Sequence, residues 1–289
     1  MVPGKGVKWA ELFPDQFWER MKHLPVVYLP MGICEPHGHV AVLGLDTIKA
    51  EYLCEEAAFR WGGIVAPTQG YQIHEVGFHA PWLADVVGNV NACMTSMPTA
   101  PMLYFFLYQL RTFHNAGFRM AIVVSGHAGG NQKDFRLAAK AFMEASDMVV
   151  FVVSDPELTG GEYPGDHAGR YEISQLMHIV PEFIDLTKAD KWKVSDPETR
   201  FAQGRDASEA TAANGEIILE KCLSGIRELL DRMDAGRMME REMMHYSTVE
   251  GIWQEVKSQF GKWVTPKINE DQNPAPSDSI WKPFERYIL

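Results

Sequence analysis

The architecture of this chain is set by the stretch Leu24-Pro-Val-Val-Tyr-Leu-Pro-Met-Gly-Ile-Cys-Glu-Pro-His-Gly-His39. Its apolar, β-branched run from Val26 to Met31 predicts a buried strand, and glycine and proline residues end that strand where the polar residues begin. Glu35 and His37 therefore follow the C-terminal end of a strand, which is the edge where open α/β sheets build their sites. Residues two apart in extended chain point to the same side, so both side chains can face one site.

A second segment repeats this arrangement. The run 120–124 predicts another buried strand, and the turn Ser125-Gly-His-Ala-Gly-Gly-Asn131 joins it to a helix. His127 lies in that turn. A glycine-rich turn before a helix can instead hold a phosphate, but neither G-x-x-x-x-G-K-[ST] nor G-x-G-x-x-G occurs here, which disfavours nucleotide binding.

A third strand is predicted at 148–153, followed by a Gly/Pro-rich loop at 159–165 that could act as a flap. A further helix is expected to begin near Ala168, just after His167 and with Glu172 in its first turns. Taken singly, Glu172 can be a favourable helix-dipole charge and His167 an ordinary loop histidine. Asp46, at the start of another helical pattern, can equally be an N-cap.

Taken together, these carboxylates and imidazoles are the ligand types that hold zinc, manganese or iron and leave positions open for water and substrate. Their order in the chain resembles the creatininase family of metal-dependent amidohydrolases over about residues 24 to 235. The matching motifs are Glu35-Pro-His-Gly38, Asp46, Gly126-His-Ala-Gly-Gly-Asn131 and His167-Ala-Gly-Arg-Tyr-Glu-Ile-Ser174.

The resemblance implies an α/β fold, a three-layer α/β/α sandwich with a mostly parallel central sheet, usually assembled as a hexamer. It also implies two divalent metal ions (Zn, Mn or Fe) at the C-terminal edge of the sheet. By position, Glu35 and His127 would hold one metal and His37 the other, with Asp46 bridging them and Glu172 completing the second. The other predicted site residues are His167, a proton donor or substrate ligand, and the substrate-binding residues Asn131 and His39.

The chain also departs from its relatives around the expected pocket. Creatinine-hydrolysing members carry a glutamate where this chain has Gly129, and the segments 39–45 and 72–102 are not the usual ones. Creatinine itself is therefore disfavoured as the substrate. The favoured function is hydrolysis of an amide C–N bond in a small cyclic substrate. The alternatives are cleavage of a C–C bond in a cyclic diketone or keto-inositol such as 3-dehydro-scyllo-inosose, and a family member that binds a metabolite without turnover.

Composition narrows the class of protein. The chain has 289 residues, of which 46% are hydrophobic and 22% charged, as in an ordinary folded α/β protein. Its formal charge of −11 disfavours nucleic acid and anionic membranes as partners, and no apolar run is long enough to span a bilayer. Four cysteines without C-x-x-C spacing and the absence of a signal-peptide pattern predict a reducing cytoplasm. Cys34 remains an alternative nucleophile, disfavoured because the adjacent Glu35 carboxylate would raise the pKa of its thiol.

Two regions are distinguished along the chain, a metal hydrolase domain at 1–245 and a C-terminal extension at 246–289. A long amphipathic helix is predicted from Asn214 to Met244. The extension is rich in proline but holds too many aromatic residues for free disorder, so it is expected to pack on its own domain or on a neighbouring subunit. The aromatic residues Trp82, Tyr104, Phe105 and Phe106 are expected in the core or at a subunit interface.

Overall fold

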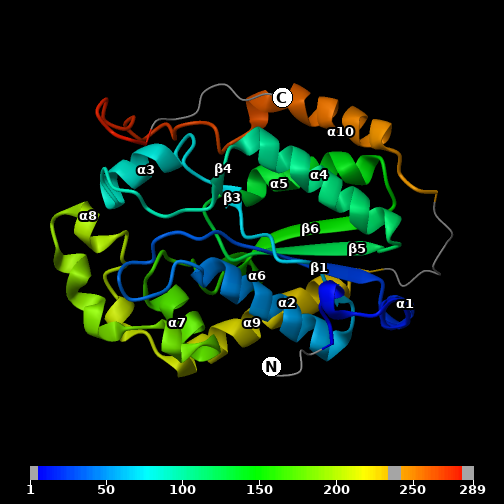
Figure 1. Cartoon of the computed structure of the whole chain (residues 1–289), viewed down its shortest axis with the longest axis horizontal. Coiled ribbons are helices and arrows are strands. Elements are labelled where there is room, and N and C mark those ends of the chain that lie inside the picture. The colour runs from blue at the N-terminus through cyan, green and yellow to red at the C-terminus, as the bar shows by residue number, and fades with distance from the viewer. Residues whose placement is uncertain (1–5, 234–241, 282–289) are drawn as a thin grey trace.

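A parallel β-sheet forms the centre of the computed structural model, which describes residues 6–233 and 242–281. The strand order is β2-β1-β5-β6, and every neighbouring pair is parallel. Helices cover both faces of this sheet (Figure 1), so the expected three-layer α/β/α sandwich is confirmed. The strands are β1 (Val26–Met31), β2 (Ile64–Val65), β5 (Met120–Ser125) and β6 (Val149–Ser154).

The two central strands, β1 and β5, are buried along their whole length, because helices cover them on both sides. Their register pairs Val26 with Met120 and Met31 with Ser125, so both strands end at the same level. The edge strand β6 is partly exposed. The predicted strand at 26–31 has the observed bounds. The strand predicted at 120–124 is one residue longer, and the one predicted at 148–153 is shifted by one residue.

Each face of the sheet is covered by its own set of helices (Figure 1). On one face, α4 (Thr99–Asn115), α5 (Gln132–Glu144) and α10 (Tyr246–Ser258) share a core with α1 (Pro14–His23). On the other face lie α2 (Leu45–Trp61), the four-residue α6 (Asp155–Leu158), α7 (Arg170–Ile179) and α9 (Ala212–Leu230). Outside the sandwich, two short strands pair in a second sheet: β3 (Gln72–Ile73) precedes α3 (His79–Val86), and β4 (Ser96–Met97) follows it. The short helix α8 spans Pro197–Arg200.

The connections that follow the two central strands leave on opposite faces of the sheet. From β1 the chain passes through α2 on one face to β2, whereas from β5 it passes through α5 on the opposite face to β6. Such a divergence opens a crevice beyond the carboxyl ends of the two adjacent strands. The loops after β1 and β5 carry the predicted motifs to this crevice.

Two sequence expectations about helix ends are wrong. The helix predicted from Asn214 to Met244 ends at Leu230. Residues 231–232 form a turn, and 234–241 lie outside the described residues. Asp46 is not an N-cap, because Gly44 occupies that position and Asp46 lies inside the first turn of α2. Its carboxylate is therefore not used to cap the helix.

The C-terminal extension packs on the same chain throughout its described part, residues 246–281. Trp253 and Trp263 belong to the core that α4 and α5 form, and both are nearly fully buried. Trp281 packs against Ala80 and Leu83 of α3. Phe284 and Tyr287 lie outside the described residues. Among the described helices, none has both the length and the apolar character required to cross a membrane.

Candidate metal centre

Two glycines place Asp46 at the centre of the crevice. A Cβ atom on Gly32, after β1, would lie 2.4 Å from the Thr47 backbone nitrogen, and one on Gly126, after β5, would lie 2.0 Å from the Asp46 carbonyl oxygen. Only glycine permits so close an approach of two backbones. The first turn of α2 consequently rests on the ends of both central strands, and the Asp46 carboxylate, 1% exposed, faces the crevice between them.

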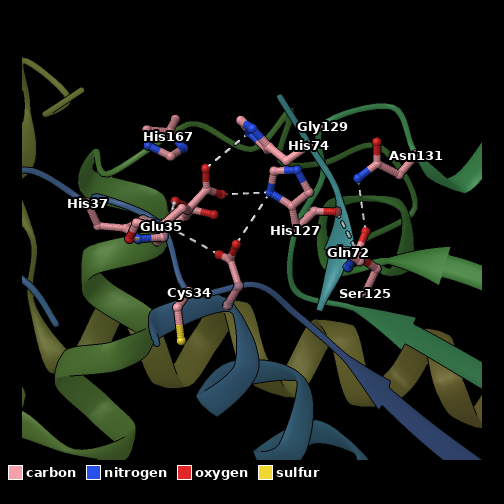
Figure 2. Close-up of polar contacts among 12 residues, drawn as sticks. Cys34, Glu35, His37, Gln72, His74, Ser125, His127, Gly129, Asn131 and His167 are labelled. Atoms are coloured by element: carbon pink, nitrogen blue, oxygen red, sulfur yellow. Dashed lines mark hydrogen bonds and ion pairs between the residues drawn. The ribbon is translucent and has the colours of Figure 1, made fainter. Parts of the chain in front are cut away.

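The five predicted ligands meet around Asp46. Figure 2 shows three of them, Glu35, His37 and His127, close together. One carboxylate oxygen of Asp46, Oδ2, lies 3.3 Å from His127 Nδ1, which is 2.7 Å from Glu35 Oε1. The other oxygen, Oδ1, lies 3.2 Å from His37 Nε2, which is 3.4 Å from Glu172 Oε2. Asp46 thus links two groups, Glu35–Asp46–His127 and His37–Asp46–Glu172, and within each group the ligand atoms lie within 4.8 Å of one another.

These atoms are close without being hydrogen-bonded. Glu35 Oε1, His37 Nε2 and both carboxylate oxygens of Asp46 are buried and have no hydrogen-bond partner. Buried polar groups are almost always satisfied, so unpaired acceptors that converge on a common point require another explanation. Two divalent cations would satisfy them, and the donor set of carboxylates and imidazoles suits zinc, manganese or iron.

Contacts with the backbone and with a buried lysine orient the second group. Because a carbonyl oxygen can only accept, His37 Nδ1 donates to Glu35 O at 3.1 Å, and this bond turns Nε2 towards Asp46 and Glu172. The ammonium group of Lys49, 0% exposed, lies 2.5 Å from Glu172 Oε1 and 3.4 Å from Asp155 Oδ2. Burial opposes ionisation of Glu172, but Lys49 and His37 outweigh it and hold the pKa of that carboxyl below its usual range.

The electrostatics of the first group also favour a cation. Burial disfavours a charged His127, yet the carboxylates of Glu35 and Asp46 outweigh burial and raise the pKa of its imidazole to about 10. The two carboxylates therefore favour a positive charge at this point of the cluster. A divalent cation would supply that charge and would bind the imidazole in its deprotonated form.

Two histidines that the sequence analysis did not select lie beside this group. The backbone N–H of Glu75 donates to His74 Nδ1 at 3.0 Å, so His74 carries its proton on Nε2, which points to Glu35 Oε2 at 3.3 Å. His79 Nε2 donates to Gly129 O at 3.2 Å. Both side chains are buried. They lie in the segment 72–102, which the family motifs leave unmatched, and a spacing of five residues is not a recognised ligand pattern, so only the structure finds them.

His167, in the third predicted segment, lies beside the second ligand group. Its Nε2 donates to Pro36 O at 2.9 Å, and its ring stacks on His37 with centroids 4.8 Å apart. Trp82 contacts the His167 ring edge-on, with centroids 5.1 Å apart. These contacts fix the ring and leave Nδ1 as the nitrogen available to a bound molecule.

The two predicted substrate-binding residues lie elsewhere. Asn131 is buried and donates to Gln72 Oε1 at 3.0 Å and to Ile73 O at 2.8 Å. The ring of His39 is hydrogen-bonded to Thr199 O at 2.5 Å. Neither lines the cavity described next, so their positions suit a supporting role. The Sγ atom of Cys34 points away from the cluster (Figure 2).

A cavity of about 400 Å³ opens over the cluster. Its walls include two aromatic residues of the α3 region, Phe78 and Trp82. Trp82 packs against a hydrophobic cluster, as expected, and in addition lines the cavity. No lysine or arginine is found among the described residues that line it. The full lining is Glu35, His74, Phe78, His79, Trp82, His127, Ala128, Gly129, Pro164, Gly165, Asp166, His167, Glu172, Asn269 and Gln272.

Comparison with known proteins relates this site to characterised enzymes. The chain is 26% identical over 236 residues to the creatinine amidohydrolase of Pseudomonas putida, covering 71% of this chain and 88% of that protein. It is 22% identical over 287 residues to the 3-dehydro-scyllo-inosose hydrolase of Thermotoga maritima, covering 83% of this chain and 88% of that protein.

Solved structures show the same fold. A structure described as creatininase Mn superposes with a TM-score of 0.63 at 24% identity, covering 78% of this chain and 97% of that one. A creatininase variant described as the Zn-Zn type gives 0.60 at 23% identity, with 77% and 96% covered. The model of the family Creatininase, creatinine amidohydrolase, matches residues 10–230. With its sandwich, its motifs and most of its length accounted for by that model, this chain belongs to the creatininase family.

Proposed function

We propose that this member of a hydrolase family uses two divalent metal ions, one held by Glu35, Asp46 and His127 and the other by His37, Asp46 and Glu172. The observation that carries the proposal is the buried Asp46 carboxylate, whose two unpaired oxygens face two separate sets of ligands. When bound, such a metal pair polarises a carbonyl group and activates water near neutral pH.

We assign the role of general acid to His167. Its Nε2–H bond to Pro36 O is satisfied in every protonation state, so a transferable proton has to be carried by Nδ1. Loss of that proton leaves a neutral ring already held by Pro36 and by the stack on His37. The ring can therefore protonate a leaving group without moving.

The substrate we propose is a small uncharged ring that contains a carbonyl group. The cavity holds no lysine or arginine among its described residues to attract an anion, and its volume suits a compact molecule. Creatinine is disfavoured because creatinine-hydrolysing members carry a glutamate where this chain has Gly129. A side chain has no room at this position: a Cβ would lie 2.7 Å from His127 Nε2 and 3.0 Å from His79 Nε2. We favour cleavage of an amide C–N bond. Cleavage of a C–C bond in a cyclic keto-polyol is the second candidate, supported by the Thermotoga relative, which aligns with the larger share of this chain.

The test combines metal analysis with kinetics on purified enzyme, screened against lactams, cyclic ureides and keto-inositols. His167→Ala should keep both metals and lose about 10²–10⁴-fold in turnover, the usual scale for general acid–base catalysis. Glu172→Ala should instead empty or weaken one metal position, because it removes an anionic ligand. A wild-type protein that binds no divalent metal contradicts the proposal, and metal loss in His167→Ala together with retention in Glu172→Ala reverses the two roles.

A further inference from the structure

The family match ends at residue 230, yet two residues beyond it, Asn269 and Gln272, line the cavity. They belong to residues 263–281, which we call the C-terminal strap. The strap crosses the α3 region, as the orange-to-red segment beside α3 shows in Figure 1. Part of the cavity wall is thus supplied by a segment that the family model does not include.

The strap is fixed to the core where it begins. Trp263 is 1% exposed and donates from its indole N–H to Val256 O. The buried Asp134 carboxylate of α5 accepts the backbone N–H groups of Val264 at 2.8 Å and Thr265 at 2.9 Å, together with the Thr265 hydroxyl. A buried carboxylate satisfied by three donors makes a rigid anchor, since charged hydrogen bonds are the strong ones.

From this anchor the strap is bonded to the chain on both sides of α3. Gly77, with φ +51°, approaches it so closely that a Cβ would lie 2.1 Å from the Thr265 carbonyl oxygen. Gln272 Nε2 donates to Phe78 O at 2.8 Å, before the helix. Trp281 donates its indole N–H to Gly88 O at 2.6 Å, after the helix. These contacts attach the strap to the chain just before and just after α3.

The region held in this way carries the wall of the cavity. Phe78, His79 and Trp82 all line it, and the ring of Trp82 also touches His167. None of the three is among the five proposed metal ligands. A displacement of α3 would therefore change the shape of the substrate cavity while the metal ligands, carried by the loops after β1 and β5 and by α2 and α7, stay in place.

We propose that the C-terminal strap is the substrate-specificity element of this enzyme: it sets the position of the α3 wall and places the Asn269 carboxamide at the cavity rim. The assignment rests on the proposed function. The ligand class that fits is an uncharged ring with polar substituents, because aromatic faces contact the ring and a carboxamide can donate to or accept from hydroxyl or carbonyl groups.

The experiment uses the full-length, metal-loaded protein and two variants that release the strap at different points. Gln272→Ala removes the bond to Phe78, and Trp281→Phe removes the indole donor while it retains an aromatic ring. The matched control is Glu270→Ala, an exposed strap residue with no recorded bond to the described part of the chain. Hydrogen–deuterium exchange of residues 77–89, metal content and steady-state kinetics are measured on the wild type, on these three variants and on Asn269→Ala.

Both releasing variants should retain two metals per chain and wild-type exchange in β1 and β5, while residues 77–89 exchange faster. We expect the KM for ring substrates to rise about fivefold, on the scale of one hydrogen bond, with kcat little changed. Asn269→Ala should raise the KM of hydroxyl- or carbonyl-substituted rings more than that of unsubstituted ones. Glu270→Ala should behave as wild type.

Two results overturn the proposal. Unchanged exchange in residues 77–89 in both variants shows that the strap does not hold the wall. Loss of metal, or faster exchange throughout the sheet, shows that it supports the fold as a whole and not the cavity. The exchange result is independent of turnover, so a wild-type protein that is inactive on every ring contradicts the proposed function separately from the strap.

Discussion

Replacement of Lys49 by methionine tests whether the buried ammonium group of Lys49 stabilises both the fold and the ionised Glu172 carboxylate. Methionine has a similar length but no charge, so Lys49→Met would leave the Glu172 and Asp155 carboxylates buried beside each other without their cation. Removal of one partner from a buried ion pair costs about 3–5 kcal/mol. That is a large part of the roughly 5–15 kcal/mol by which a native protein is stable.

The same substitution should weaken metal binding at the His37–Asp46–Glu172 group. Burial disfavours ionised Glu172, and Lys49 is the main influence that keeps its pKa low. Without Lys49 that pKa rises, so the carboxylate takes up a proton at a higher pH and competes less well for metal. A group with a depressed folded pKa contributes stability above its unfolded pKa and loses it as pH falls through the folded value. The variant should therefore release metal at a higher pH than wild type.

Guanidinium denaturation and metal analysis across pH 4–8 measure both effects. The matched control is Lys8→Met, which removes a half-exposed pair with Glu51 and Glu55 and should cost at most about 1 kcal/mol. Addition of Asp155→Asn to Lys49→Met should recover part of the lost stability, because it removes one of the two buried carboxylates that Lys49→Met leaves without a cation. A Lys49→Met protein as stable as Lys8→Met, with the wild-type pH of metal release, would refute the reasoning.

Three further predictions concern the site and the assembly. His74→Leu should weaken metal binding at the Glu35 group about 10–100-fold, whereas His74→Gln, which retains an N–H donor for the Glu35 carboxylate, should recover most of it by competitive metal titration. Gly129→Ala should reduce both metal affinity and turnover, since its Cβ forces the rings of His79 and His127 apart; unchanged values for both would contradict the close contacts. Light scattering should report a hexamer or another oligomer well above the 32.6 kDa chain mass, and a monomer at micromolar concentration would remove the assembly prediction.

The sheet and the proposed ligands could be predicted because their signals are local. Each ligand directly follows an apolar run or opens a periodic helix, and parallel strands bring such positions to a common edge. The convergence of Glu35, His37, Asp46, His127 and Glu172 is the result. The role of Asp46 was ambiguous in sequence, because a capping aspartate and a bridging aspartate look alike. The structure separates the two possibilities, because Gly44 occupies the N-cap position and the packing of Gly32 and Gly126 turns Asp46 towards the crevice.

The cavity wall could not be predicted, because its residues are held by contacts across long stretches of sequence. His74 and His79 acquire their roles from Glu35 and Gly129, and the bond from Gln272 to Phe78 spans 194 residues. Neither hydrophobic periodicity nor motif spacing carries information at that range. The end of α9 at Leu230 was not predicted, because the apolar pattern continues to Met233 and no glycine or proline marks the end of the helix.

The meeting of Gly32, Gly126 and Asp46 has a consequence for how this protein can change over time. The residue that joins the two ligand groups lies where two strands and a helix touch backbone to backbone, with no space for even one added methyl group. A substitution at this joint disturbs the scaffold and the reaction centre together, so it is removed by selection on folding as well as on activity. The α3 wall and the strap also meet backbone to backbone, at Gly77, but they carry none of the five proposed metal ligands. New substrates can therefore be acquired through the periphery of the molecule while the hydrolytic centre is inherited intact.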